Sequence, residues 1–200
     1  MLLGIQPHIP NMAEEKKPLP TAEIVTGVII TIILIVFAVP RYMNWTEGSV
    51  IGSEATKLYY NLETAKNTAI KNKHKVWVVF QGNSGYMTFE DVNGNGTLDS
   101  GEPARKIKLN PKIQFGINLE TPLENVWGSG SVSHPIDFGR NREKFYFKPS
   151  GKASSSGAIY LIAQADVGSS DADIRAVKIM GAVGQISVLR FSPNDSPPWK

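Results

Sequence analysis

The chain has 200 residues, of which 42% are hydrophobic and 20% charged, so it is long enough for one globular domain and a further segment at one end. Its 21 Lys and Arg against 18 Asp and Glu leave a net charge of +3, too small a surplus to mark a dedicated nucleic-acid-binding protein. The chain has no Cys, which excludes disulfides, thiolate zinc sites, iron–sulfur clusters and a cysteine nucleophile.

Residues 1–18 contain several prolines and show no hydrophobic periodicity, so we expect a flexible leader there. The strongest pattern follows at residues 24–39, which carry no charge over 16 residues. As a helix this run is about 24 Å long, close to the ~30 Å hydrocarbon thickness of a bilayer. We therefore predict a transmembrane helix over residues 19–48, kinked or interrupted at Pro40, whose ring removes an amide donor.

A cleaved signal peptide is the alternative interpretation of the same segment. Lys16 and Lys17 would form its basic start, and cleavage would follow Ala38. The mature chain would then begin at Val39 and would be a secreted domain.

A second helix is expected over residues 49–74, because apolar residues recur there at alternating steps of four and three. Such spacing places them in one stripe on a helix, with charged residues on the other faces. The stripe consists of Ile51, Ala55, Leu58, Leu62, Ala65 and Ala69.

From residue 75 the period changes to that of short β-strands separated by turn residues. We expect a β-sheet head domain over residues 75–191, ending in a hairpin, and a polar, proline-rich flexible tail over residues 192–200. The predicted fold class is α+β, a long N-terminal helix whose second half packs on a mostly antiparallel sheet. The expected strands cover residues 75–80, 85–90, 105–109, 112–117, 144–148, 158–164, 174–180 and 185–191.

Residues 91–102 fit the calcium-loop pattern D-x-[DN]-x-[DN]-G-x5-E at every fixed position. Calcium takes six to eight oxygen ligands from a loop that folds back on itself, and Gly96 permits the sharp turn. The flanking segments are predicted strands, and Asn-Gly sequences also make hairpin turns, so a metal-free turn is the alternative. The candidate ligands are the side chains of Asp91, Asn93 and Asn95, the carbonyl of Thr97, Asp99 directly or through water, and both carboxylate oxygens of Glu102.

No pattern typical of catalysis is present. The three His lie far apart, and no nucleophile with a base, or paired acid and base, stands at a working spacing. The sequence therefore predicts a non-enzymatic protein without a small-molecule substrate. Local clusters of Lys and Arg, as at residues 105–112, are usually a solvated face, and contact with nucleic acid has no support beyond them.

This order of elements resembles that of type IV pilin-like proteins. Glu23 matches the glutamate at the start of the family's apolar helix, and this alignment makes Leu19 the first residue after leader cleavage. Pro40 then falls where pilins place a proline within that helix. The loop over residues 91–102 is similar to the signature loop of the minor pseudopilin and minor pilin group, which includes the H-type pseudopilin of type II secretion.

The resemblance implies a structural subunit of a type IV pilus or a type II secretion pseudopilus, assembling through its apolar N-terminal helix. It implies that Glu23 neutralises the N-terminal amine of a neighbouring subunit, once the leader has been removed before Leu19. Pro18 departs from the family pattern, because prepilin peptidase generally needs a small residue just before the cut, and leader cleavage therefore stays open.

The implied location is the cytoplasmic (inner) membrane, crossed once, with the head domain outside the cytoplasm. The implied partners are other pilins or pseudopilins, an inner-membrane assembly platform and membrane lipid. Two further hypotheses remain beside this one. One is a secreted calcium-binding β domain released from a signal peptide, and the other is a DNA-binding or adhesive tip pilin.

Overall fold

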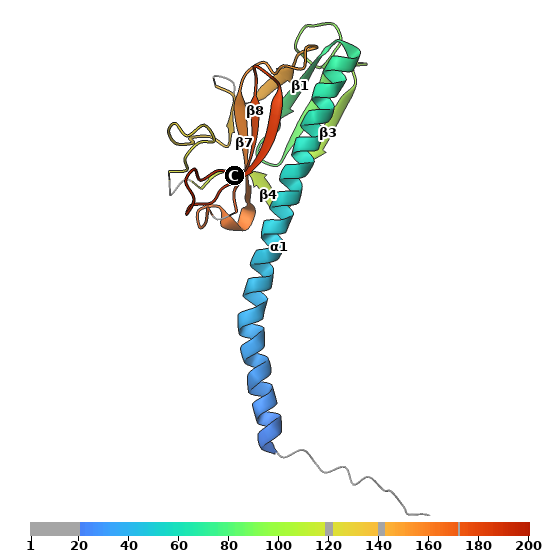
Figure 1. Cartoon of the computed structure of the whole chain (residues 1–200). Coiled ribbons are helices and arrows are strands. Elements are labelled where there is room, and N and C mark those ends of the chain that lie inside the picture. Colours follow the sequence, from blue (N-terminus) through green and yellow to red (C-terminus); the bar gives the residue numbers. More distant parts are fainter. Residues whose placement is uncertain (1–20, 119–121, 140–142, 172) are drawn as a thin grey trace, which may run out of the picture. The chain divides into compact units, whose positions relative to one another are not determined.

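The computed structural model describes residues 21–118, 122–139, 143–171 and 173–200, without the side chains of residues 21–24 and 36–49 (Figure 1). The chain divides into two compact units, Met1–Met43 and Asn44–Lys200. The expected leader, with Pro18 and Leu19, lies outside the described residues.

Helix α1 runs from Thr21 to Asn72 as one continuous helix of 52 residues. The helix is therefore not interrupted at Pro40, and a kink at this proline stays a prediction. A proline removes one amide donor from a helix, and the hydrogen bonds before and after it can still carry the helix through. The predicted second helix is the C-terminal part of α1, which ends where Lys73 adopts a left-handed backbone with φ of 62°.

Four strands form the first sheet, in the order β3-β2-β1-β6 with every pair antiparallel. β3 lies at one edge, and Arg105, Lys106 and Lys108 on it are exposed. The strands are β1 (Lys75–Phe80), β2 (Gly85–Asp91), β3 (Ala104–Lys108) and β6 (Lys144–Phe147).

Five strands form the second sheet, also antiparallel, in the order β4-β7-β8-β9 with β5 paired to β7. The sequence predicted the hairpin of β8 and β9 but not the two-residue β5, and it indicated one sheet rather than two. The strands are β4 (Ile113–Phe115), β5 (Ile136–Asp137), β7 (Gly157–Ala163), β8 (Arg175–Met180) and β9 (Gln185–Arg190), with a short 3-10 helix η1 (Gln164–Asp166) after β7.

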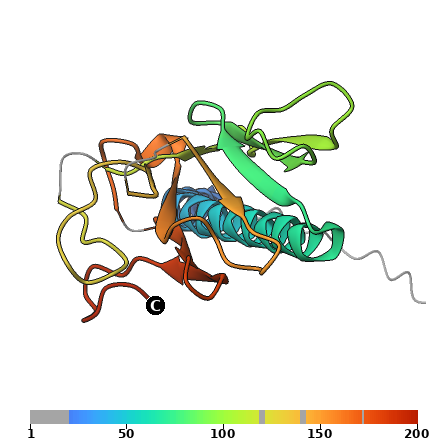
Figure 2. The ribbon, with the colours of Figure 1, turned by 90° about the horizontal axis from the view of Figure 1, so that it is seen from above.

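The predicted apolar stripe on α1 is the centre of the core. All six of its residues are at most 5% exposed. They pack in one cluster with side chains from both sheets, whose strands flank the helix in Figure 2. The cluster includes Val76, Val78 and Phe145 from the first sheet and Ile159, Leu161 and Val177 from the second.

The segment expected to be a flexible tail is packed against the second sheet. Trp199 is only 8% exposed, and its Nε1 donates to the carbonyl of Glu124 at 2.7 Å. Its ring contacts Tyr160 and Phe191. Burying one large aromatic side chain outweighs the polar, proline-rich composition that suggested a loose end.

One close approach fixes the turn between β8 and β9. Gly184 has φ of +68°, and a β-carbon there would overlap the carbonyl oxygen of Gly151. Glycine is required here both for the backbone conformation and for the space.

Candidate functional site

The apolar segment of α1 exposes large hydrophobic side chains on all sides. Eight of the eleven residues from 25 to 35 are Val, Ile or Leu, and each of these eight residues is between 49% and 61% exposed. Residues 32–35 are all apolar and cover a full helical turn, so this part of the helix has no polar face that could be directed toward water. The Thr31 hydroxyl donates to the carbonyl of Gly27 at 2.8 Å, which satisfies that polar group within the helix.

Within the residues that the structure describes, no helix has an apolar stretch of the length and hydropathy needed to cross a membrane. The positions of Glu23 and Pro40 belong to α1, but their side chains lie outside the described part of the chain.

The candidate metal loop, residues 91–102, connects β2 to β3, and Asp91 is its anchor. Asp91 is the last residue of β2 and is 2% exposed. Its Oδ2 accepts hydrogen bonds from the Trp77 indole Nε1 and from the Gly96 amide, each at 3.1 Å. Its Oδ1 is buried and has no hydrogen-bond partner among the described residues.

The surroundings of Asp91 favour its ionised form. Burial acts to raise the pKa of this carboxyl, whereas the hydrogen bonds from Trp77 and Gly96, the charge of Lys75 and the nearby amide of Gly94 lower it. The balance leaves the pKa of Asp91 below its ordinary value, so a buried negative charge faces the loop.

Three exposed side chains meet in the middle of the loop. The amide groups of Asn93 and Asn95 both donate to Oδ2 of Asp99, each at 2.6 Å. The carbonyl oxygens of the same two amides accept the backbone amides of Asn95 and Thr97, at 3.0 and 2.8 Å. These bonds fold the loop back on itself.

Glu102 closes the loop. Its Oε1 accepts the amide of Val92 at 2.8 Å, and its Oε2 accepts the amide of Asp99 at 3.0 Å. Over the described part of the chain, no three Asp, Glu or His side chains gather as a metal-binding group. The structure thus brings the six predicted ligand residues into one loop without drawing their carboxylates together.

Sequence reasoning did not single out Trp77. It lies on β1, donates to Asp91, and its ring lies 3.3 Å from where a β-carbon of Gly96 would stand. Lys144 lies over the same ring at 4.9 Å from its centroid. Only the pairing of β1 with β2, which sequence alone does not give, places this indole under the loop.

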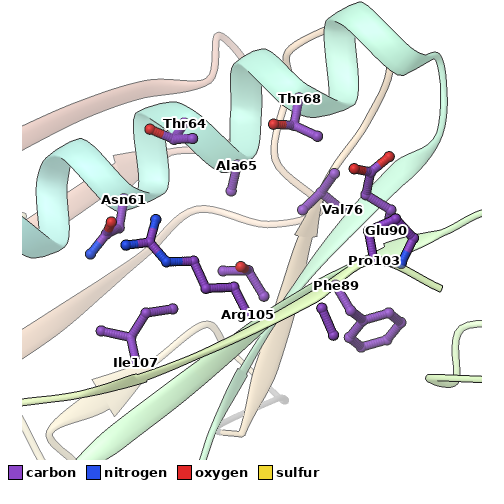
Figure 3. Close-up of a pocket in the computed structure, with 12 residues that line it drawn as sticks. Asn61, Thr64, Ala65, Thr68, Val76, Phe89, Glu90, Pro103, Arg105 and Ile107 are labelled. Atoms are coloured by element: carbon purple, nitrogen blue, oxygen red, sulfur yellow. The ribbon is translucent and has the colours of Figure 1, made fainter. Parts of the chain in front are cut away.

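A groove of about 200 Å³ lies between α1 and strands β2 and β3 (Figure 3). It is smaller than the 300–1,000 Å³ of typical ligand sites. Two of its polar groups are already used within the protein, since Asn61 donates to the Tyr86 hydroxyl and Glu90 accepts from Asn72. The groove is best explained as a seam between helix and sheet.

A family model described as type II transport protein GspH matches residues 54–180, which include the loop and strands β1 to β8. Among solved structures, the minor pseudopilin EpsH from the type 2 secretion system of Vibrio cholerae is similar over 72% of this chain and 98% of that chain. The identity is 12% and the TM-score 0.45. No curated protein matches the chain.

The family match covers more than half of the chain, including the part of α1 that carries most of the stripe. The chain therefore belongs to the GspH family of type II transport proteins, and it is a minor pseudopilin, a structural subunit that assembles with other pseudopilins into the pseudopilus of type II secretion.

Proposed function

We propose that the apolar segment of α1 anchors this subunit in the cytoplasmic membrane and then becomes buried among the apolar helices of neighbouring subunits as the filament grows. The observation that carries the proposal is the exposed apolar surface of residues 25–35. A surface of this kind, continuous around a helix, needs either lipid or other apolar helices as its surroundings.

Moving such a helix from lipid into a bundle changes its apolar surroundings little, because lipid tails are as apolar as Ile or Leu. Side-chain packing and polar pairing must then decide how the helices align. We propose that Glu23 supplies the polar pair, by neutralising the amine that leader cleavage before Leu19 would free on a neighbour. Once the helix is buried among neighbouring apolar helices, a carboxylate beside the apolar segment is costly without such a partner.

The proposed partners are other pseudopilins, membrane lipid and an inner-membrane platform driven by a separate ATPase. A type IV pilus is the second filament that the sequence resemblance allows. The family match, whose description names type II transport, favours the secretion pseudopilus.

Site-specific photo-crosslinking in cells with a type II secretion system tests the proposal. A photoreactive residue at Ile33 should form adducts with other pseudopilins when the assembly ATPase is active, and with lipid alone when the ATPase is inactivated. The same residue placed at Tyr60, on an exposed position of the head-domain part of α1, should not capture lipid. The absence of both lipid and pseudopilin adducts at Ile33 would contradict the proposal.

The mass of the crosslinked subunit also reports its first residue. A start at Leu19 means that the leader is removed despite Pro18, and a start at Met1 means an uncleaved anchor. A start at Val39 would mean that the helix is lost, and the secreted-domain hypothesis would replace this one.

A further inference from the structure

We propose that the candidate metal loop, residues 91–102, binds one calcium ion, and that this ion fixes the loop against β1. The observation that carries the proposal is the buried Oδ1 of Asp91, which has no hydrogen-bond partner among the described residues. The ligand oxygens would come from Asp91, Asn93, Asn95, Thr97, Asp99 and Glu102.

An unpaired carboxylate oxygen in the protein interior is costly, and the great majority of buried polar atoms have a partner. The Gly96 amide and the Trp77 indole both donate to Oδ2, so the Asp91 carboxylate lies where the loop meets β1. A cation held by the loop would give the buried Oδ1 the partner that it lacks.

The middle of the loop already gathers donors around a negative charge. Oδ2 of Asp99 accepts two amide groups at 2.6 Å, so its negative charge lies between the side chains of Asn93 and Asn95. Calcium would replace these two neutral donors with a divalent charge. The carbonyl oxygen of Asn93 retains acceptor capacity beyond its bond to the Asn95 amide. The carbonyl oxygen of Asn95 accepts both the amide and the hydroxyl of Thr97, and it would release the hydroxyl to bind calcium.

The donor set favours calcium over other metal ions. Every available ligand is a carboxylate, an amide or a backbone carbonyl oxygen, and the loop offers neither the imidazole nor the thiolate that zinc and copper prefer. Six or more oxygens from a flexible loop suit calcium, whereas magnesium demands a rigid octahedron and retains water. Binding must draw Asp99 and Glu102 inward, because Glu102 now accepts two backbone amides.

Trp77 makes the proposal measurable. Its indole is hydrogen-bonded to Asp91 and lies beside Gly96, so an ion in the loop should change its fluorescence. Titrating calcium chloride into the full-length chain in detergent micelles should give a saturable heat, a matching fluorescence change and a higher thermal midpoint. The fluorescence change should be lost in Trp77→Phe, while the heat remains.

Variants at the exposed Asp99 and the half-buried Glu102 reduce the risk that Asp91→Asn fails to fold. Asp99→Asn and Glu102→Gln should each weaken calcium binding by about tenfold or more, because each removes a charged ligand. Asp195→Asn removes the same charge far along the sequence, from an exposed ion pair with Lys200, and should leave the affinity unchanged.

Three results would overturn the assignment. The first is a wild-type chain with neither a saturable heat nor a thermal shift. The second is an equal loss of affinity in Asp195→Asn, which would indicate diffuse charge attraction. The third is an equal response to magnesium chloride at the same concentration, which would show that the loop does not recognise calcium.

Discussion

Tyr86 shows how one buried side chain ties the helix to the first sheet. It is 1% exposed, and its hydroxyl accepts a hydrogen bond from Asn61 of α1 at 2.8 Å. Burial raises the pKa of Tyr86 to about 12, with Glu54 adding to the rise and Asn61 and Arg105 opposing it. The neutral phenol is thus the form that the fold accepts.

Alkaline pH should therefore destabilise the head domain. Below pH 10 the Tyr86 phenol is neutral in the folded and in the unfolded chain. Between pH 10 and about 12 it ionises only in the unfolded chain. The unfolded state then binds fewer protons, so the free energy of unfolding should fall by about 1.4 kcal/mol per pH unit from this residue. Tyr86→Phe should reduce that slope in urea unfolding of the full-length chain in micelles, measured from pH 9 to 12.

The slope, rather than the stability at one pH, is the informative quantity, because Tyr86→Phe also leaves Asn61 without its partner. Tyr60→Phe, at a position that is 64% exposed, is the matched control and should leave the slope unchanged. Equal slopes in Tyr86→Phe and the wild type would contradict the role assigned to Tyr86.

At the scale of single residues, the sequence predicted the members of the candidate metal loop but not their arrangement. The spacing from Asp91 to Glu102 is a local property, and in the structure hydrogen bonds from Asp91 and Glu102 close these residues into one folded loop. The contact with Trp77 depends on strand pairing, which no local pattern contains. Whether the loop holds calcium stays a prediction.

At the scale of elements, the C-terminal part of α1 is the most predictable piece of the molecule. Its stripe could be predicted because one helix face packs on the core over about five turns. The residues that recur at helical spacing in the sequence are therefore the ones that are buried. The division into two sheets was not visible, because alternation reports which face of a strand is buried and not which strand is its neighbour. In β7 all seven residues are buried, since the helix packs on one face and side chains from the segment 117–132 and from the C-terminal segment pack on the other.

Truncating the stripe should cost stability in proportion to burial. Leu58→Ala, at a position that is 1% exposed, should lower the free energy of unfolding by about 2–5 kcal/mol through lost burial and the cavity left behind. Tyr60 is two residues away and exposed. Tyr60→Ala should change the free energy of unfolding by no more than about 1 kcal/mol, which is the stabilisation expected from its edge-on contact with Tyr59. Denaturant unfolding measures both, and similar losses would argue against α1 as the centre of the core.

At the scale of the whole molecule, the chain combines a folded head with a helix segment whose surface is unsuited to water. A charge in that segment should therefore affect location without affecting the head. Ile30→Asp should cost about 2.5–3.5 kcal/mol in the membrane, enough to shift partition by about 100-fold or more toward the soluble fraction. Ile30→Leu is the control, and carbonate washing of membranes followed by immunoblotting gives the measurement. Unchanged retention of Ile30→Asp would contradict a membrane anchor.

The basic edge strand β3 affects how subunits contact one another at high local density. Three exposed cations, Arg105, Lys106 and Lys108, stand on a strand whose outer backbone groups are not used by the sheet. Like charges repel a second copy that would otherwise add to this edge and extend the sheet from one molecule to the next. Subunits held at high local density along a fibre can thus remain separate domains and escape fusion into an amyloid-like ribbon.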